Sequence, residues 1–330
     1  AQHLLNQGHL GYTEALGLPA FRQAISAHYE STYGVGISAD RVVATFGASG
    51  AFLLAFLSAF DVGDRVAIIE PGYPAYRNIL QALGIEVVPI RPAPSSKFHK
   101  VIELLQQDYP LQGLIIASPA NPTGTMLTAD ELSTLISWCK THQVRLISDE
   151  IYHGINYDRA PTTALGYDEN VIVINSFSKY YAMTGWRLGY LIVPEGWVDA
   201  ASRLHQNLMI SANEFVQQAG IAVLREGRKT CEAMKKEFNR RRLFMLKRLR
   251  ELDMDPGYQP DSAFYIFLRY RDQKRSSLEL SMEILEKTGV ALTPGIDFGT
   301  LGEGYLRFSY ANSLENLEKA LERLKESKLL

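Results

Sequence analysis

Between Arg41 and Val193 the sequence alternates short apolar, β-branched runs with longer stretches of helical periodicity. Short runs that are apolar throughout are typical of strands buried on both faces. Strands separated by helices predict an α/β fold, with a mostly parallel seven-stranded sheet sandwiched by helices. The expected strands are Val42–Thr45, Arg65–Ile69, Glu86–Ile90, Leu114–Ala117, Val144–Ser148, Val171–Asn175 and Leu188–Val193. The expected helices are Ala48–Phe60, Tyr76–Leu83, Ala129–Thr141 and Trp197–Met209.

After Ser211 the pattern changes. A long, highly charged amphipathic helix is expected to bridge two domains or to lie on the surface. It precedes the elements of a smaller α+β unit, so we expect a large domain over 1–235 and a small C-terminal domain over 236–330. The segment Ala1–Gln7 resembles the end of a helix, so we expect that this sequence begins within an element. The elements expected here are helix Cys231–Leu252, strand Phe264–Leu268, helix Leu278–Thr288, strand Tyr305–Ser309 and helix Leu314–Lys325.

Composition excludes several classes of partner. The net charge of −2 over 330 residues argues against nucleic acid or an anionic membrane as a main partner. No stretch is long and apolar enough to span a bilayer, and no secretory signal is visible. Two cysteines, Cys139 and Cys231, make no disulfide framework and favour a reducing, cytoplasmic location.

The strongest functional motif is Ser176-Phe177-Ser178-Lys179, followed by Arg187. It comes directly after an expected buried strand, and the carboxyl ends of strands are where open α/β sheets bind ligands. Serine hydroxyls and an arginine are groups that hold a phosphate. An amine beside them indicates a lysine that forms a Schiff base with pyridoxal phosphate (PLP). The alternative is a solvated lysine in a polar loop.

A second candidate for phosphate binding is the turn Gly47-Ala48-Ser49-Gly50, between a strand and a helix. The N-terminus of a helix presents free N–H groups and a positive dipole end to an anion. Ser49 adds a hydroxyl. Glycines at such turns also occur for steric reasons alone. The turn indicates a phosphate site only in combination with Ser176, Ser178 and Arg187.

Asp149 ends another expected strand, and Tyr152 follows three residues later. An aspartate at this sheet edge can pair with a pyridinium nitrogen and keep the ring an electron sink. Tyr152 can donate a hydrogen bond to the phenolic oxygen of the cofactor. The alternative is an acidic turn that caps a helix.

Three further residues complete the set of candidates. Asn121, in a Pro-Gly turn after a strand, has an amide that can face the cofactor oxygen and the substrate carboxylate. Tyr73 can stack on the pyridine ring. Arg307 is a single basic residue in an apolar strand, and a bidentate guanidinium suits an α-carboxylate. The alternatives are ordinary turns for Asn121 and Tyr73 and an exposed edge strand for Arg307.

Taken in order along nearly the whole chain, these motifs resemble the class I/II aminotransferases, PLP enzymes of fold type I. The resemblance implies that Lys179 carries the cofactor and moves the proton, and that Asp149 pairs with the pyridine nitrogen. It also implies a homodimer, because a tyrosine matching Tyr12 reaches the phosphate in the neighbouring subunit. It further implies that the N-terminal part of the small domain is missing from this sequence. The residues that match the family are Tyr12, Ala48, Ser49, Tyr73, Asn121, Asp149, Tyr152, Ser176, Ser178, Lys179, Arg187 and Arg307.

The implied function is transfer of an amino group between an amino acid and a 2-keto acid by a ping-pong mechanism through a Lys179 aldimine. Two alternatives stay open: a PLP-dependent carbon–sulfur β-lyase on the same fold, and a non-catalytic PLP-binding regulator. The sequence does not name the substrate. Tyr73, Tyr152 and Phe177 favour an apolar or aromatic side chain.

Overall fold

The computed structural model describes residues 11–92 and 99–330. The expectation for Ala1–Gln7 lies outside the described residues. In the described ranges every helix is too short or too polar to cross a membrane.

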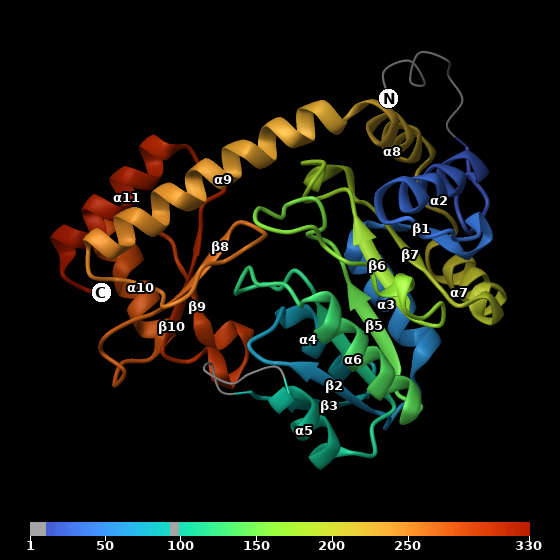
Figure 1. The fold of residues 1–330 in the computed structure, drawn as a ribbon, viewed down its shortest axis with the longest axis horizontal. Coiled ribbons are helices and arrows are strands. Elements are labelled where there is room, and N and C mark those ends of the chain that lie inside the picture. The colour runs from blue at the N-terminus through green and yellow to red at the C-terminus, as the bar shows by residue number, and fades with distance from the viewer. Residues whose placement is uncertain (1–10, 93–98) are drawn as a thin grey trace.

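The large sheet has seven strands in the order β1-β7-β6-β5-β4-β2-β3, and only β7 runs antiparallel to its neighbours (Figure 1). The expected mostly parallel seven-stranded sheet is confirmed, with strand ends displaced by at most one residue. The strands are β1 (Val42–Phe46), β2 (Arg65–Ile69), β3 (Glu86–Ile90), β4 (Gly113–Ala117), β5 (Arg145–Asp149), β6 (Ile172–Ser176) and β7 (Leu188–Ile192).

Helices cover both faces of this sheet, because the strand side chains are apolar on both sides. In β4, for example, Leu114 and Ile116 belong to one buried cluster and Ile115 to the other. One face packs against α2 (Pro19–Tyr33), α5 (His99–Asp108), α6 (Ala129–Thr141) and α8 (Glu214–Glu226). The other packs against α3 (Gly47–Ala59), α4 (Pro74–Ala82) and α7 (Val198–Met209).

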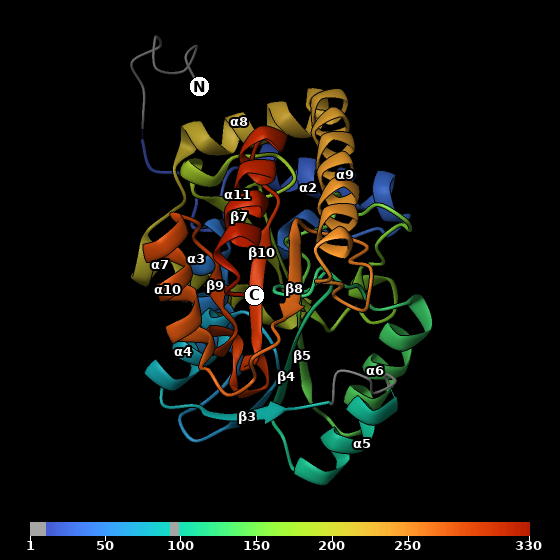
Figure 2. The same cartoon turned by 90° about the vertical axis from the view of Figure 1, so that its left-hand side faces the viewer.

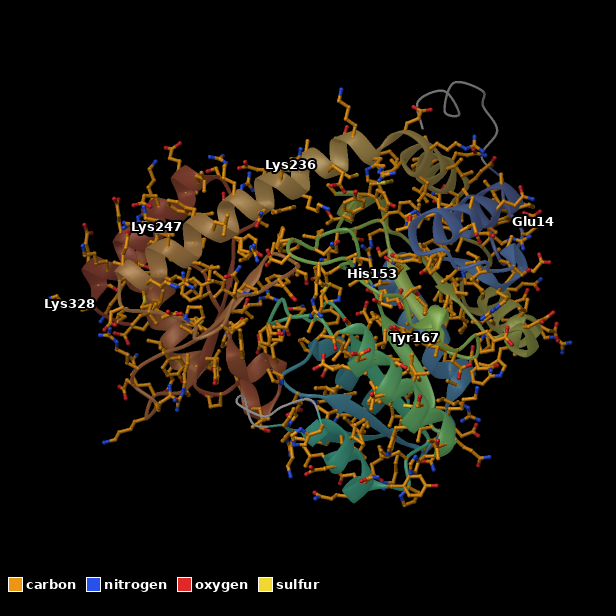
Figure 3. The ribbon with its side chains drawn as sticks, in the orientation of Figure 1. Glu14, His153, Tyr167, Lys236, Lys247 and Lys328 are labelled. Carbon is orange, nitrogen blue, oxygen red and sulfur yellow. The ribbon has the colours of Figure 1, made fainter. Side chains whose placement is uncertain are left out.

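The C-terminal part forms a separate, three-stranded antiparallel sheet in the order β8-β10-β9. Helix α9 leads to it from the large sheet, and its lysines Lys236 and Lys247 project into solvent (Figure 3). Seen from the side of this small sheet, β8 and β10 lie in front of the large sheet (Figure 2). Its elements are α9 (Arg228–Glu251), β8 (Tyr265–Arg269), α10 (Ser277–Thr288), β9 (Thr293–Pro294), β10 (Tyr305–Ser309) and α11 (Leu314–Ser327).

The sequence-based expectations omit α2, α5, α8 and the two-residue strand β9. Helix α2 carries the usual boundary signals, because Pro19 opens it and Gly34, at φ +66°, closes it. Its apolar residues Phe21, Ile25 and Tyr29 recur at helical spacing and are fully buried. These signals were available in the sequence, whereas a two-residue strand has no pattern of its own.

Candidate active site

A cavity of about 360 Å³ opens where the carboxyl ends of β4, β5 and β6 meet the small sheet. It brings together ten of the residues singled out from the sequence. They are Ala48, Ser49, Tyr73, Asn121, Asp149, Tyr152, Ser178, Lys179, Arg187 and Arg307.

Lys179 enters this cavity from the turn after β6. The turn is fixed locally, because the Ser178 backbone N–H donates to Ser176 Oγ at 3.1 Å. Lys179 Nζ lies 5.7 Å from the ring centroid of Tyr152. Burial lowers the pKa of Lys179, and the positive charge of Arg307 lowers it further. A lysine with a lowered pKa supplies more of the neutral amine, which is the nucleophilic and proton-accepting form.

Asp149 lies at the end of β5 and is 3% exposed. The hydroxyl of Tyr76 donates to its Oδ2, and the Ile151 N–H donates to Oδ1 at 3.0 Å. Burial raises the pKa of Asp149 to about 6, while these hydrogen bonds oppose the rise. A buried carboxylate that faces a cavity stabilises a cation or an N–H donor placed against it.

The opposite end of the cavity is suited to an anion. Helix α3 begins at Gly47 and has no side-chain cap, so its first N–H groups are free for a ligand. Arg187, held at φ +54°, places its guanidinium against this helix start. Gly47 has φ +69°, which favours glycine, and a Cβ there would lie 2.6 Å from Arg187 Nη2 and push this guanidinium aside. The exposed Ser49 adds a hydroxyl to the same surface.

Arg307 projects from β10 on the side of the small sheet. Its Nη1 donates to Asn121 Oδ1 at 2.7 Å, and its Nη2 donates to Thr293 Oγ1 at 3.1 Å. Its guanidinium carbon lies 4.3 Å from the ring centroid of Tyr265. These polar partners are neutral, and Arg307 Nε is buried without any hydrogen-bond partner in the described structure. The guanidinium is thus held in place, and the second N–H on each Nη is left for a carboxylate.

Three expected residues lie elsewhere. Ser176 is buried behind the cavity, and its hydroxyl donates to the Leu188 carbonyl at 3.0 Å and lies 2.9 Å from Ser178 Oγ. Tyr12 is 84% exposed and does not line the cavity of its own chain. The expectation that Phe177 lies near the substrate is wrong, because its ring is fully buried against Phe21, 5.7 Å between centroids.

Sequence reasoning missed four polar or aromatic contributors to the site. Tyr76 holds Asp149, and Tyr265 shares a 2.9 Å hydrogen bond with Tyr152. Phe298 and Thr293 contact Arg307 from the segment around β9. Tyr76 follows Tyr73 by three residues, the spacing of one helix face, which was the only local signal. The others reach the cavity only through tertiary packing.

Comparison with known proteins gives a consistent result. The model of the family described as aminotransferase class I and II matches residues 1–324. A valine–pyruvate aminotransferase from Mycobacterium tuberculosis is 45% identical over 325 residues, covering 97% of this chain and 83% of that protein. An aspartate aminotransferase from Pyrococcus horikoshii is 34% identical over 342 residues, covering 99% and 85%.

Solved structures agree with this result. The crystal structure of an aminotransferase from Mycobacterium tuberculosis matches with a TM-score of 0.93 at 42% identity, covering 99% of this chain and 86% of that one. An aromatic aminotransferase from Pyrococcus horikoshii matches with a TM-score of 0.92 at 33% identity, covering 100% and 91%. Sequence and fold thus agree with the same enzyme class over nearly the whole chain. The chain belongs to the class I and II aminotransferases, which are PLP-dependent enzymes of fold type I.

Proposed function

We propose that Lys179 holds PLP covalently and is the base that moves the proton during amino-group transfer. The observation that carries the proposal is the position of its amine, with a lowered pKa, in one cavity with Asp149 and Arg307. Bound PLP supplies an electron sink that acidifies the Cα–H of an amino acid. Once the amino substrate displaces it from PLP, the free Lys179 amine would accept the proton from Cα and deliver it to the aldehyde carbon of the cofactor.

The remaining cavity residues fit the parts of this cofactor. We assign the phosphate to the uncapped start of α3, with Ala48, Ser49, Ser178 and Arg187, and Ser176 supports Ser178 from behind. The buried carboxylate of Asp149 suits the ring nitrogen, because an ionised acid there holds a proton on that nitrogen. We assign the phenolic oxygen to Tyr152 and Asn121 and ring stacking to Tyr73.

The substrate carboxylate is assigned to Arg307, with Asn121 beside it. A fixed guanidinium that lines the cavity and keeps a second N–H on each Nη supports this role. In the described lining of the cavity, the cationic side chains are Lys179, Arg187 and Arg307, each of which already has a role. That lining therefore has no further cation to bind the side-chain carboxylate of a dicarboxylic substrate. We therefore propose an apolar amino donor, as the name of the valine–pyruvate relative indicates for that protein, rather than aspartate.

A half-reaction screen tests this proposal. Purified holoenzyme is mixed with single amino acids, and the absorbance of the cofactor is followed without a keto acid. We expect valine and aromatic amino acids to react faster than aspartate and glutamate. Faster reaction with aspartate would contradict the apolar assignment. Release of pyruvate and ammonia without an acceptor would indicate a lyase, an alternative that no relative named above favours.

We also propose a homodimer in which Tyr12 completes the phosphate site of the partner. Tyr12 is 84% exposed, and the neighbouring Thr13 N–H donates to Ser211 Oγ at 3.2 Å. Thr13 thus contacts the segment of Ser211, and Leu208 and Ile210 just before Ser211 are each about half exposed. Exposed apolar groups gathered in one area support a protein interface.

A complementation experiment tests the shared site. Tyr12→Phe subunits are mixed with Lys179→Ala subunits under exchange conditions. If Tyr12 acts across the interface, one site of each heterodimer has both native residues and recovers PLP retention and activity. If Tyr12 acts within its own chain, no heterodimer site is intact and the mixture shows no gain.

We also propose a domain boundary and a cellular location. The domain division at residue 235 is supported by the apolar clusters, since Leu224 packs with the large sheet and Met245 with the small one. A cytoplasmic location is supported by Cys139 and Cys231, which are both buried free thiols. Limited proteolysis tests the first proposal, and cell fractionation tests the second.

A further inference from the structure

A buried carboxylate that the proposed function does not use lies at the end of β2. Glu70 follows this strand directly and is 2% exposed. Arg77 of α4 forms an ion pair with Oε1, and Arg91 Nε lies 3.1 Å from Oε2. A buried carboxylate matched by two guanidiniums is strongly held. Glu70 is therefore a fixed point on the edge of the large sheet.

Segment 295–302, which lies between β9 and β10, packs against the same carboxylate. Thr300 Oγ1 donates to Glu70 Oε2 at 3.3 Å, and the Gly72 N–H donates to the Phe298 carbonyl at 2.9 Å. Gly299 has φ +112°, and a Cβ on it would lie 2.4 Å from Glu70 Cδ. Only glycine allows this approach. Segment 295–302 is thus docked on the large sheet through residues 70–72.

Phe298 connects this docking to the cavity. Its side chain is 1% exposed, and the Arg307 guanidinium carbon lies 4.9 Å from its ring centroid. Tyr265 contacts the same guanidinium at 4.3 Å. Since Gly72 directly precedes Tyr73, the contact between Gly72 and Phe298 joins two sides of the cavity. Movement of segment 295–302 would change the surroundings of Arg307.

We propose that Glu70 is a positioning residue for the substrate carboxylate. It holds segment 295–302 against the large sheet, which keeps Phe298 against Arg307 and fixes the direction of the guanidinium. Glu70 does not line the cavity that holds Lys179, so it acts through Phe298. The inference rests on the proposed role of Arg307 as the carboxylate anchor.

The test uses holoenzyme and isovalerate, a monocarboxylate without an amino group, in titration calorimetry. Glu70→Gln removes the charge and keeps the shape. We expect isovalerate to bind about tenfold more weakly to this variant, since couplings through packed side chains are of that order. The KM for valine should rise similarly while kcat changes by less than about twofold. Thr300→Val, which removes one donor to Glu70, should give a smaller effect in the same direction.

The matched control is Asp158→Asn. Asp158 pairs with Arg242 of α9 at 2.8 Å and so also joins the large sheet to the C-terminal part, but it does not line the cavity. We expect isovalerate binding to stay unchanged in this control. A loss equal to that of Glu70→Gln would overturn the proposal, because it would show that any weakened interdomain pair suffices.

A double-mutant cycle with Arg307→Lys separates the positioning role of Glu70 from the carboxylate-binding role of Arg307. If Glu70 acts through Arg307, Glu70→Gln should weaken isovalerate binding less than about twofold in the Arg307→Lys background. Equal losses in both backgrounds, or no loss in the native one, would overturn the role of Glu70. If Arg307→Lys alone leaves isovalerate binding unchanged, the carboxylate role of Arg307 fails, and the inference built on it fails too.

Discussion

The two sides of the cavity are built in different ways. On the cofactor side, Asp149, Ser178, Lys179 and Arg187 come from neighbouring strand ends and are fixed by nearby backbone groups. On the carboxylate side, Arg307 depends on side chains far away in the sequence, such as Asn121, 186 residues earlier. The proposed cofactor side is therefore set mainly by elements of the large sheet, and the proposed carboxylate side by the docking of the two sheets.

This difference predicts that changes on the cofactor side affect turnover and changes on the carboxylate side affect substrate binding. Lys179→Ala should show the largest effect. We expect kcat to fall about a thousandfold or more, because both the covalent link and the proton-transferring base are lost. Borohydride reduction followed by peptide mapping should place the pyridoxyl group on Lys179 in the native protein. Its recovery on another lysine would refute the assignment.

Asp149→Asn should give the next largest effect. The substitution keeps the shape but removes the charge that holds a proton on the ring nitrogen. We expect kcat to fall about a hundredfold or more while the protein still binds PLP. Tyr76→Phe, which removes only the hydroxyl that donates to Asp149, should cost less. Steady-state kinetics and cofactor absorbance measure both, and near-native turnover of Asp149→Asn would show that this carboxylate does not face the ring.

Arg307→Lys should show the opposite kinetic signature. A point charge replaces a bidentate fork, so KM for amino and keto acids should rise about tenfold or more while PLP content stays the same. Steady-state kinetics with both substrates, together with the PLP content of the purified variant, measures this. Loss of cofactor from this variant would contradict the comparison, because it would place Arg307 on the cofactor side.

Glu150→Gln should show the smallest effect, on stability. Burial raises the pKa of Glu150 to about 8, so the folded state retains a proton that the unfolded chain releases near its ordinary pKa of 4.5. The stability contribution of this proton is complete below about pH 4.5 and is lost as the pH rises through 8. Between pH 5 and 8, the Tm of the native protein should fall relative to that of the variant by a few degrees, about 1.5 °C per kcal/mol for a chain of 330 residues.

Differential scanning calorimetry of the two holoproteins across this pH range measures the difference. His153, which lies in the interior (Figure 3), is 3.5 Å from Glu150 Oε2. Burial lowers the pKa of His153 to about 3, whereas the unfolded chain takes up this proton near pH 6.5. His153 therefore makes the stability of both proteins rise between pH 5 and 6.5, and this common slope cancels in the difference between them. The exposed Glu322→Gln is the control and should follow the native protein. Parallel curves for Glu150→Gln and the native protein would show that Glu150 is already ionised in the fold.

The large sheet and most of the cofactor side were predictable from the sequence. Buried parallel strands are continuous apolar runs, so the boundaries of β2 and β3 agree to the residue. The carboxyl ends of the parallel strands β5 and β6 lie at the same edge of the sheet, which places Asp149 and Lys179 in one cavity. The misplacement of Phe177 follows from side-chain alternation: Ser176 and Ser178 lie on one side of the chain and the ring between them enters the core.

The sequence by itself determined the α/β fold, the strand ends and the residues that local backbone geometry can fix, because these depend on short-range periodicity and turn chemistry. Only the tertiary structure decided which distant side chains complete the site. Tyr265, Phe298 and Glu70 carry no local signal, and their partners lie on other elements. Contacts between separate sheets depend on how those sheets dock, and periodicity within one segment does not encode that.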